Sequence, residues 1–368
     1  MGVLAVGTAL GLVMGSSSAM AYTGPNSWST AGLKEVARYT GQLSWSVDGL
    51  GTMSGDGTIQ VNKPAGGLVG KAFFMAGQAL PGSQPTLDVP SSTTLNGKPV
   101  TFSYESLDAG AGYDFNNYFA DVTDVLYADL TAAPEGISDI AVHEGGDIEG
   151  TALIVLWIDP SVDAASVVIA FGNSDPAGDS FTLAFPALTQ PQTEDLQLSM
   201  GITYSYQDPG ESVSDTQAST VVVNGTTIAD LAGGFDDCNE ADPTNCNDGS
   251  LLTVGGIGDS TANATVPGAD PVVAGADDEL FTLSPLVNVG DTTITVSTTN
   301  ASNDDNIFFD AFYLKRVVVA DAVQLEAYTP TLPNTGVNVG QVVTTASLAS
   351  LALVGGLVAW VAARRRRA

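Results

Sequence analysis

The side chains of this sequence best suited to chemistry are its carboxylates, which number 41. Several stand close together between apolar runs, where turns are expected. Ca²⁺ binds roughly six to eight oxygen ligands, and acidic loops supply them. The sequence therefore predicts calcium binding by Asp277, Asp278 and Glu279 together with Asn303, Asp304 and Asp305, and a third acidic loop contains Asp236, Asp237 and Asp248. The alternative is ordinary turn chemistry, because Asp and Asn side chains also cap turns.

Other reactive groups are scarce. His143 is the only histidine, and it is expected in a turn or at a strand end, so a zinc site built from several histidines is not expected. The sequence contains no G-x-S-x-G elbow, P-loop or dinucleotide glycine fingerprint. A carboxylate pair for glycoside hydrolysis carries no weight among so many acidic residues. We therefore expect a protein that is not an enzyme and has no catalytic residues.

Carbohydrate binding by stacking would require exposed aromatic rings. Trp28 and Trp45 are the candidates for such a platform, whereas Trp157 lies in an apolar run that is expected in the core. Aromatic residues of β-domains belong to the core more often than to a binding platform. The core is therefore the favoured interpretation for all three.

The C-terminal region has three parts in a fixed order. Leu332, Pro333, Asn334, Thr335 and Gly336 come first, and an apolar run of 22 residues without a charge follows at 342–363. That length is enough to cross a bilayer as a helix, which needs about 20 residues. Four arginines, Arg364, Arg365, Arg366 and Arg367, come next and would stay in the cytoplasm.

This order resembles the LPxTG cell-wall sorting signal of Gram-positive surface proteins, and all five motif positions match. The resemblance implies that the helix and the arginines hold the precursor in the plasma membrane. A sortase cysteine would then attack the Thr335 carbonyl, release the chain from Gly336 onward and form an acyl-enzyme. An amine of a peptidoglycan precursor, or a lysine of another protein, would accept the acyl group. The alternative is a single-pass anchor that is never cleaved.

The N-terminus predicts export. An apolar run from Val3 to Met14 precedes Ala19-Met20-Ala21, which fits a signal peptide of residues 1–21. Removing both terminal signals leaves seven basic residues against 41 acidic ones, a formal charge of −34. Such a surface repels phosphate backbones, so nucleic acid is not expected as a partner.

Cys238 and Cys246 are the only cysteines. In an exported chain a lone pair of cysteines predicts a disulfide. The alternative, a metal–thiolate site, lacks further cysteines and a nearby histidine.

Short apolar or alternating runs punctuated by Gly, Pro, Asn and Asp predict a mainly β protein. The expected strands are 42–47, 57–61, 70–77, 151–158, 165–172, 179–185, 196–206, 219–223, 292–298 and 306–315. Only a short segment near 33–39 is expected to be helical. Many short strands with turn signals favour sandwiches or jelly rolls.

A weak internal repeat indicates two domains. The Asn-Gly turns at 96–97 and 224–225 each join two short strands, which predicts two hairpins. Segments 118–126 and 280–287 follow the hairpins, and each precedes a strand that closes its half, at 137–142 and 292–298. We expect a first β-sandwich domain at 22–180, a second at 181–330 and the sorting signal at 331–368.

The order of hairpin, middle segment and closing strand resembles galactose-binding-like jelly rolls. Residues 219–315 also resemble an uncharacterised β-domain of secreted bacterial proteins that precedes various surface anchors. Together these resemblances imply a cell-surface β protein with a transmembrane helix in its precursor, and they assign it no activity.

The leading functional prediction is a cell-wall-anchored surface protein with an adhesive or envelope-structural role. Its expected partners are sortase, peptidoglycan through a covalent bond, the membrane in the precursor, and an extracellular ligand. The first alternative is a carbohydrate-binding module or a polysaccharide-acting enzyme. The second is a pilin-like subunit that polymerises through a lysine such as Lys63 or Lys71.

Overall fold

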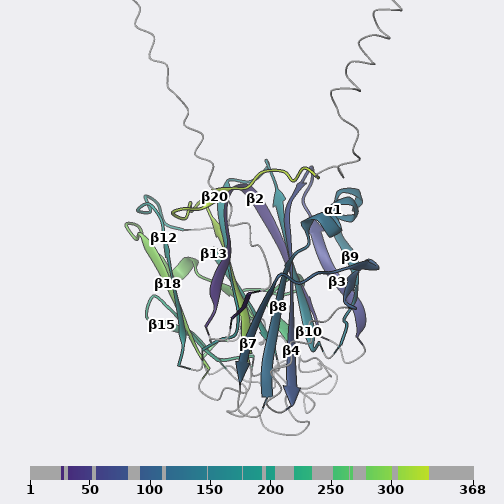
Figure 1. Cartoon of the computed structure of the whole chain (residues 1–368). Coiled ribbons are helices and arrows are strands. Elements are labelled where there is room, and N and C mark those ends of the chain that lie inside the picture. Colours follow the sequence, from purple (N-terminus) through teal and green to yellow (C-terminus); the bar gives the residue numbers. More distant parts are fainter. Residues whose placement is uncertain are drawn as a thin grey trace, which may run out of the picture. The chain divides into compact units, whose positions relative to one another are not determined.

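The computed structural model describes most of the chain between its two termini (Figure 1). The described residues are 26–28, 32–51, 55–81, 92–109, 113–146, 148–175, 177–192, 196–203, 219–233, 252–264, 266–267, 279–300 and 306–330. These residues are mainly β, and their sheets do not close into a barrel. The mainly β class expected from the sequence is therefore confirmed.

The elements fall into two consecutive series. The first comprises β1 (Asn26–Trp28), β2 (Lys34–Leu50), β3 (Asp56–Lys63), β4 (Leu68–Pro81), β5 (Thr94–Leu95), β6 (Lys98–Pro99), β7 (Tyr104–Ala109), β8 (Tyr113–Asp121), α1 (Thr123–Ala132), β9 (Gly136–His143) and β10 (Gly150–Ile158). The second comprises β11 (Ala164–Phe171), β12 (Asp179–Ala184), β13 (Leu196–Thr203), β14 (Ser219–Val223), β15 (Thr226–Ala232), β16 (Leu252–Val254), β17 (Leu280–Thr282), the 3₁₀ helix η1 (Ser284–Leu286), β18 (Thr293–Thr299) and β19 (Asn306–Lys315), followed by β20 (Val323–Gln324).

The two series repeat one topology. Strands β3, β9, β5 and β6 form a four-stranded sheet in that order, and β12, β18, β14 and β15 form another in the matching order. In the large sheet, β10 pairs with β2 and β4, and β4 pairs with β8. Correspondingly, β19 pairs with β11 and β13, and β13 pairs with β17. We call β2–β10 the first repeat and β11–β19 the second repeat.

The two Asn-Gly hairpins are confirmed, and they match in detail. Asn96 and Asn224 both have positive φ, 48° and 49°, as a tight hairpin turn requires. Asn96 donates its backbone N–H to Ala141 O at 2.8 Å and accepts the Ala141 N–H on Oδ1 at 2.9 Å. Asn224 makes the same two bonds with Thr295, both at 2.9 Å. The register of the outer sheets can therefore be compared residue by residue.

Strand β2 joins the repeats. Its residues 43–50 pair with β10, and its residues 34–42 pair with β11. Because β10 belongs to the first repeat and β11 to the second, β2 passes from the sheet of one repeat to the sheet of the other. All strands except those of the two four-stranded sheets consequently belong to one twelve-stranded sheet.

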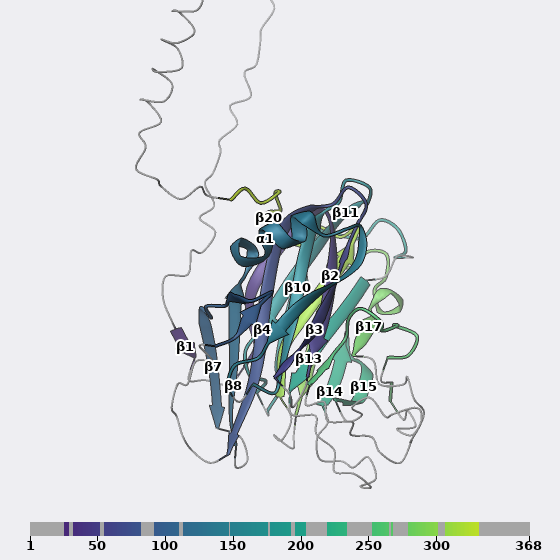
Figure 2. The same ribbon diagram turned by 90° about the vertical axis from the view of Figure 1, so that its right-hand side faces the viewer.

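In the described part of the chain, three large layers of apolar side chains hold the sheets together, and a small fourth cluster contains Ala76, Tyr118 and Ile148. Within the first repeat, Ile59 and Ile140 pack against Phe74 and Leu153, and within the second repeat the corresponding contacts join both of its sheets. The third layer lies between the repeats, where Trp45 stacks on Tyr313 with centroids 5.3 Å apart. Such an aromatic pair contributes about 0.5–1.5 kcal/mol beyond the area that it buries. Figure 2 shows β7, β8 and β4 on one side of the folded unit and β14, β15 and β17 on the other.

The expected helix at 33–39 is wrong, because β2 begins at Lys34 and continues to Leu50. Pairing with β11 outweighs the local preference of this segment, as long-range pairing often does in strands. A helix occurs instead at α1, which the sequence interpretation did not expect. Leu126 and Leu130, four residues apart, place their side chains on the buried face of that helix.

The repeats meet at residues 159–163, between β10 and β11. The domain boundary expected at residue 180 lies inside β12 of the second repeat. A division at that point would separate β11 from β19, its partner in the sheet. The described residues up to Tyr328 belong to one compact unit.

No helix in the described part of the chain is both long and apolar enough to span a membrane. The expected signal peptide, 1–21, and the expected span, 342–363, lie outside the described residues.

Candidate attachment region

The last part of the compact unit crosses the end of the sheets before the chain reaches the expected sorting motif. Strand β20 pairs in parallel with β2, so that Val323 lies opposite Tyr39. Leu325 is buried and donates its N–H to Thr40 O at 2.8 Å. Tyr328 donates its N–H to Val69 O, also at 2.8 Å. The segment is thus tied to both β2 and β4, and we call this end of the sheets the exit end.

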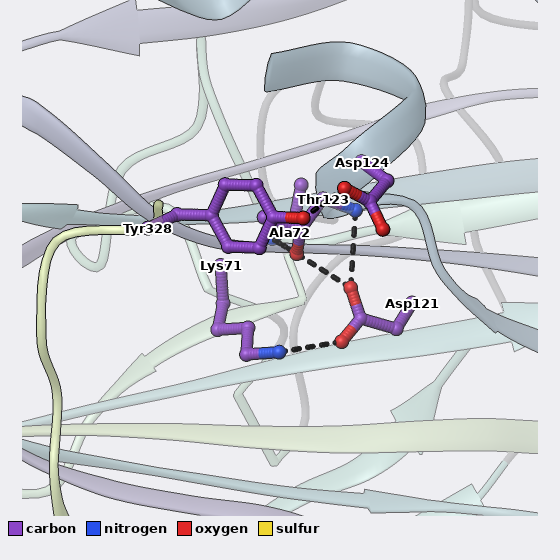
Figure 3. Close-up of polar contacts among 6 residues, drawn as sticks. All are labelled: Lys71, Ala72, Asp121, Thr123, Asp124 and Tyr328. Carbon is purple, nitrogen blue, oxygen red and sulfur yellow. Dashed lines mark hydrogen bonds and ion pairs between the residues drawn. The ribbon is translucent and has the colours of Figure 1, made fainter. Parts of the chain in front are cut away.

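A polar cluster fixes the exit end (Figure 3). Lys71 Nζ lies 2.7 Å from Asp121 Oδ2. The other oxygen of Asp121 accepts the N–H and the hydroxyl of Thr123, at 3.0 and 2.5 Å. The Thr123 hydroxyl in turn accepts the Ala72 N–H at 3.0 Å. Asp121 and Thr123 therefore join the end of β8 and the start of α1 to β4.

Tyr328 connects the segment after β20 to α1. Its hydroxyl donates a hydrogen bond to Asp124 Oδ1, and its ring meets Tyr127 edge-on with centroids 5.2 Å apart. Leu332, the first residue of the expected motif, follows Tyr328 by four residues. An extended chain of that length reaches roughly 14 Å. The compact unit thus ends shortly before the motif.

Electrostatics keep the Lys71 amine charged. Burial alone would lower the pKa of Lys71, but the hydrogen bond and the charge of Asp121 outweigh burial and raise it. Burial raises the pKa of the neighbouring Tyr39 phenol, and the Lys71 charge opposes that rise. Because the Lys71–Asp121 pair is partly exposed, its contribution to stability is small, roughly 0–1 kcal/mol.

Lys63, the other lysine considered as an acyl acceptor, is also engaged. Its Nζ donates to the carbonyls of Leu130, Thr131 and Ala133, at 3.2, 2.7 and 3.1 Å. These carbonyls lie at the C-terminal end of α1, where a positive charge interacts favourably with the helix dipole. An ammonium group has three N–H donors, and this arrangement uses all three.

The residues of the sorting motif, Leu332 to Gly336, and the arginine tail, Arg364 to Arg367, lie outside the described residues. The same is true of Cys238 and Cys246, so the disulfide stays a prediction.

Most of the expected calcium ligands also lie outside, namely Asp236, Asp237, Asp248, Asp277, Asp278, Asn303, Asp304 and Asp305. Two of these segments precede strands that the structure describes, β17 and β19. Strands β17 and β19 are both antiparallel to β13, so they are parallel to each other and begin at the same end of the sheet. Glu279, just before β17, is buried and accepts the Gly233 N–H on Oε1 at 2.9 Å. Within the described residues, no group of three or more His, Cys, Asp or Glu side chains is arranged to hold a metal.

The remaining candidates occupy structural positions. Trp157 is buried in the core of the first repeat, as expected. Trp45 is partly buried on Tyr313, between the repeats. His143 ends β9, and its Nδ1 lies 2.8 Å from Asp56 Oδ1 in an exposed pair. The side chain of Trp28 lies outside the described set.

Sequence reasoning missed the residues that fix the exit end. Asp121 and Thr123 were visible only as part of an expected middle segment. Their signal in the sequence is the Asp-x-Thr spacing just before a helix, which is typical of local side-chain to backbone bonding.

The sequence matches no known protein-family description, and no curated protein is similar enough to count as a relative.

Proposed function

We propose that this protein is a sortase substrate that is exported and then joined covalently to the cell wall through Thr335. The observation that carries the proposal is the order of the C-terminal parts: the five-residue motif, an uncharged run of 22 residues and four arginines. The position of Tyr328 supports it, because the compact unit is tied down at the exit end and leaves only a short connection before Leu332.

We further propose that each repeat is a β-sandwich of the jelly-roll, galactose-binding-like kind, and that residues 342–363 form the transmembrane helix of the precursor. The matching strand orders of the two outer sheets support the first statement. Residues 22–335 would then serve adhesion or envelope structure without catalysis, with an extracellular ligand still to be identified.

The test is the fate of the Thr335→Ala variant in the native host. Sortase must acylate residue 335, so the variant should disappear from the lysozyme-released wall fraction and stay with the membrane. Asn334→Ala changes the variable position of the motif and is the matched control, which should remain in the wall fraction. Wall attachment of Thr335→Ala at the wild-type level would overturn the proposal.

The pilin-like alternative requires a free, uncharged lysine amine as the acyl acceptor. Lys71 forms an ion pair with Asp121, and Lys63 donates to three carbonyls. Either amine would first have to leave these contacts, and for that reason we favour attachment to peptidoglycan. Ladders that survive boiling in SDS and vanish in Lys71→Arg or Lys63→Arg would favour the pilin-like reading instead.

A further inference from the structure

Asp310 is an ionisable residue in the middle of an apolar strand. It stands in the run Ile307–Leu314 of β19 and has no exposed surface. Neither of its carboxylate oxygens has a hydrogen-bond partner among the described residues. Burying a polar group without a partner is unfavourable, and burying a charge without one is much more so. The described side chains therefore leave this buried carboxyl group unsatisfied.

The surroundings of Asp310 contain further oxygen atoms. Its neighbours across the sheet are Ala170 and Met200, and this face of β19 packs against the sheet that contains β12 and β18. On that sheet Thr298 is buried, and its hydroxyl also lacks a partner in the described part of the chain. Asp179 pairs directly with Thr298, and paired positions of antiparallel strands point to the same face. Asp179 and Thr298 therefore face Asp310 across the layer.

Two backbone N–H groups fix the position of the Asp179 carboxyl group. Its Oδ1 accepts the Leu33 N–H at 3.0 Å, and its Oδ2 accepts the Asp175 N–H at 2.9 Å. Each oxygen retains a lone pair after these bonds. Burial, and then the negative charge of Asp179, raise the pKa of Asp310 to about 8. A negative charge on Asp179 therefore disfavours a second negative charge on Asp310.

The first repeat is an internal comparison. The Val122 N–H bonds to Ala72 O just as the Leu283 N–H bonds to Leu196 O, which aligns β4 with β13. Ala76 then corresponds to Met200, and their partners across the sheet, Thr151 of β10 and Asp310 of β19, correspond to each other. The shared hairpin register aligns Thr298 with Glu144 and Asp179 with Gly55. The first repeat thus has a hydroxyl at the position of Asp310 and a carboxyl at the position of Thr298, and there the Thr151 hydroxyl donates to Glu144 at 2.8 Å. The oxygens of Asp310 and Thr298 make no such bond among the described residues.

We propose that Asp310, Asp179 and Thr298 bind one Ca²⁺ ion between the two sheets of the second repeat. Two carboxylates balance the charge of one divalent cation, and a cation supplies the partner that the oxygens of Asp310 lack. All of the donors are oxygens, which suits Ca²⁺ and disfavours zinc, whose sites use histidine and cysteine. Because Ca²⁺ takes roughly six to eight ligands, main-chain carbonyls or water complete the set.

The test measures calcium bound per chain by equilibrium dialysis with ⁴⁵Ca, using the purified full chain after EDTA treatment. Asp310→Leu removes the carboxyl group and should abolish one equivalent of binding. Thr298→Val keeps the shape of the side chain and should weaken binding at least about tenfold. Glu144→Gln removes a buried carboxyl from the first repeat, and as the matched control it should bind like the wild type.

Melting temperatures provide a second readout with a distinctive sign. A ligand that binds only the folded state stabilises it by mass action. At constant ionic strength, calcium should raise the melting temperature of the wild type but not that of Asp310→Leu. In EDTA, Asp310→Leu should melt above the wild type, because a leucine suits the apolar layer better than a carboxyl group does.

Three outcomes would overturn the proposal. The first is a wild type that binds no calcium. The second is Asp310→Leu or Asp310→Asn retaining the full stoichiometry and affinity. The third is loss of all bound calcium in the double variant Asp278→Ala, Asp304→Ala, which would place the ion in the loops ahead of β17 and β19. Should Asp310→Leu fail to fold, Asp310→Asn and Thr298→Val decide the question.

Discussion

The buried carboxyl of Glu144 should make the stability of this protein depend on pH. Glu144 lies just after β9 and is 4% exposed. Its Oε1 accepts the hydroxyl hydrogen of Thr151 at 2.8 Å, and its Oε2 has no partner among the described residues. Burial raises the pKa of Glu144 from 4.5 to about 7, although the Thr151 hydrogen bond partly opposes the rise.

The direction of the effect follows from linkage. The folded state holds the Glu144 proton more tightly than the unfolded chain does, so the stability from this group is complete below pH 4.5. It is lost as the pH rises towards 7 and does not change further above that value. A pKa raised from 4.5 to about 7 corresponds to about 3 kcal/mol, at about 1.4 kcal/mol per pH unit.

The assay is chemical denaturation of the wild type and Glu144→Gln at pH 4.5 and at pH 8. Other buried acids also titrate, among them Asp48, whose pKa burial raises to about 6, so only the difference between the two proteins isolates Glu144. The variant should gain about 3 kcal/mol relative to the wild type between the two pH values.

Glu135→Gln removes an exposed carboxyl group and is the matched control. Its stability difference from the wild type should stay the same at both pH values. The reasoning about Glu144 is refuted if Glu144→Gln behaves in the same way as this control.

Three further predictions concern other parts of the chain. Lys63→Met should destabilise the protein by about 1 kcal/mol by leaving the α1 terminus without its cation, and an unchanged denaturation midpoint would count against this. Thr123→Val should cost about 1–3 kcal/mol because the buried Ala72 N–H loses its acceptor, whereas Thr123→Ser, which keeps the hydroxyl, should be affected less. A disulfide between Cys238 and Cys246 should lower the intact mass by two hydrogens and raise the free energy of unfolding by about 2–3 kcal/mol. Two freely alkylated thiols in protein taken from the cell surface would contradict this prediction.

Individual strands could be predicted from the sequence because each is a local pattern. The run at 306–315 coincides with β19, and the runs at 151–158 and 165–172 fall on β10 and β11 to within one residue. The Asn-Gly turns were equally legible, since positive φ at consecutive residues selects these two residue types.

The arrangement of the strands was less accessible. Nothing local in β2 indicates that its two halves pair with different repeats, and its first residues even looked helical. Asp310 was visible as a lone acid within an apolar run, but its meaning depends on Thr298 and Asp179, which only the register of β12 and β18 brings to the same layer. Pairing over long sequence distances decided both cases.

The connection of β20 to β2 has a mechanical consequence for a protein held at its C-terminus. A pull on the chain beyond Tyr328 reaches the folded unit first through the backbone bonds to Val69 and Thr40. From Thr40 the tension passes into β2, whose two halves belong to the sheets of different repeats. Both repeats therefore resist the pull together, and neither can be drawn out while β2 remains paired.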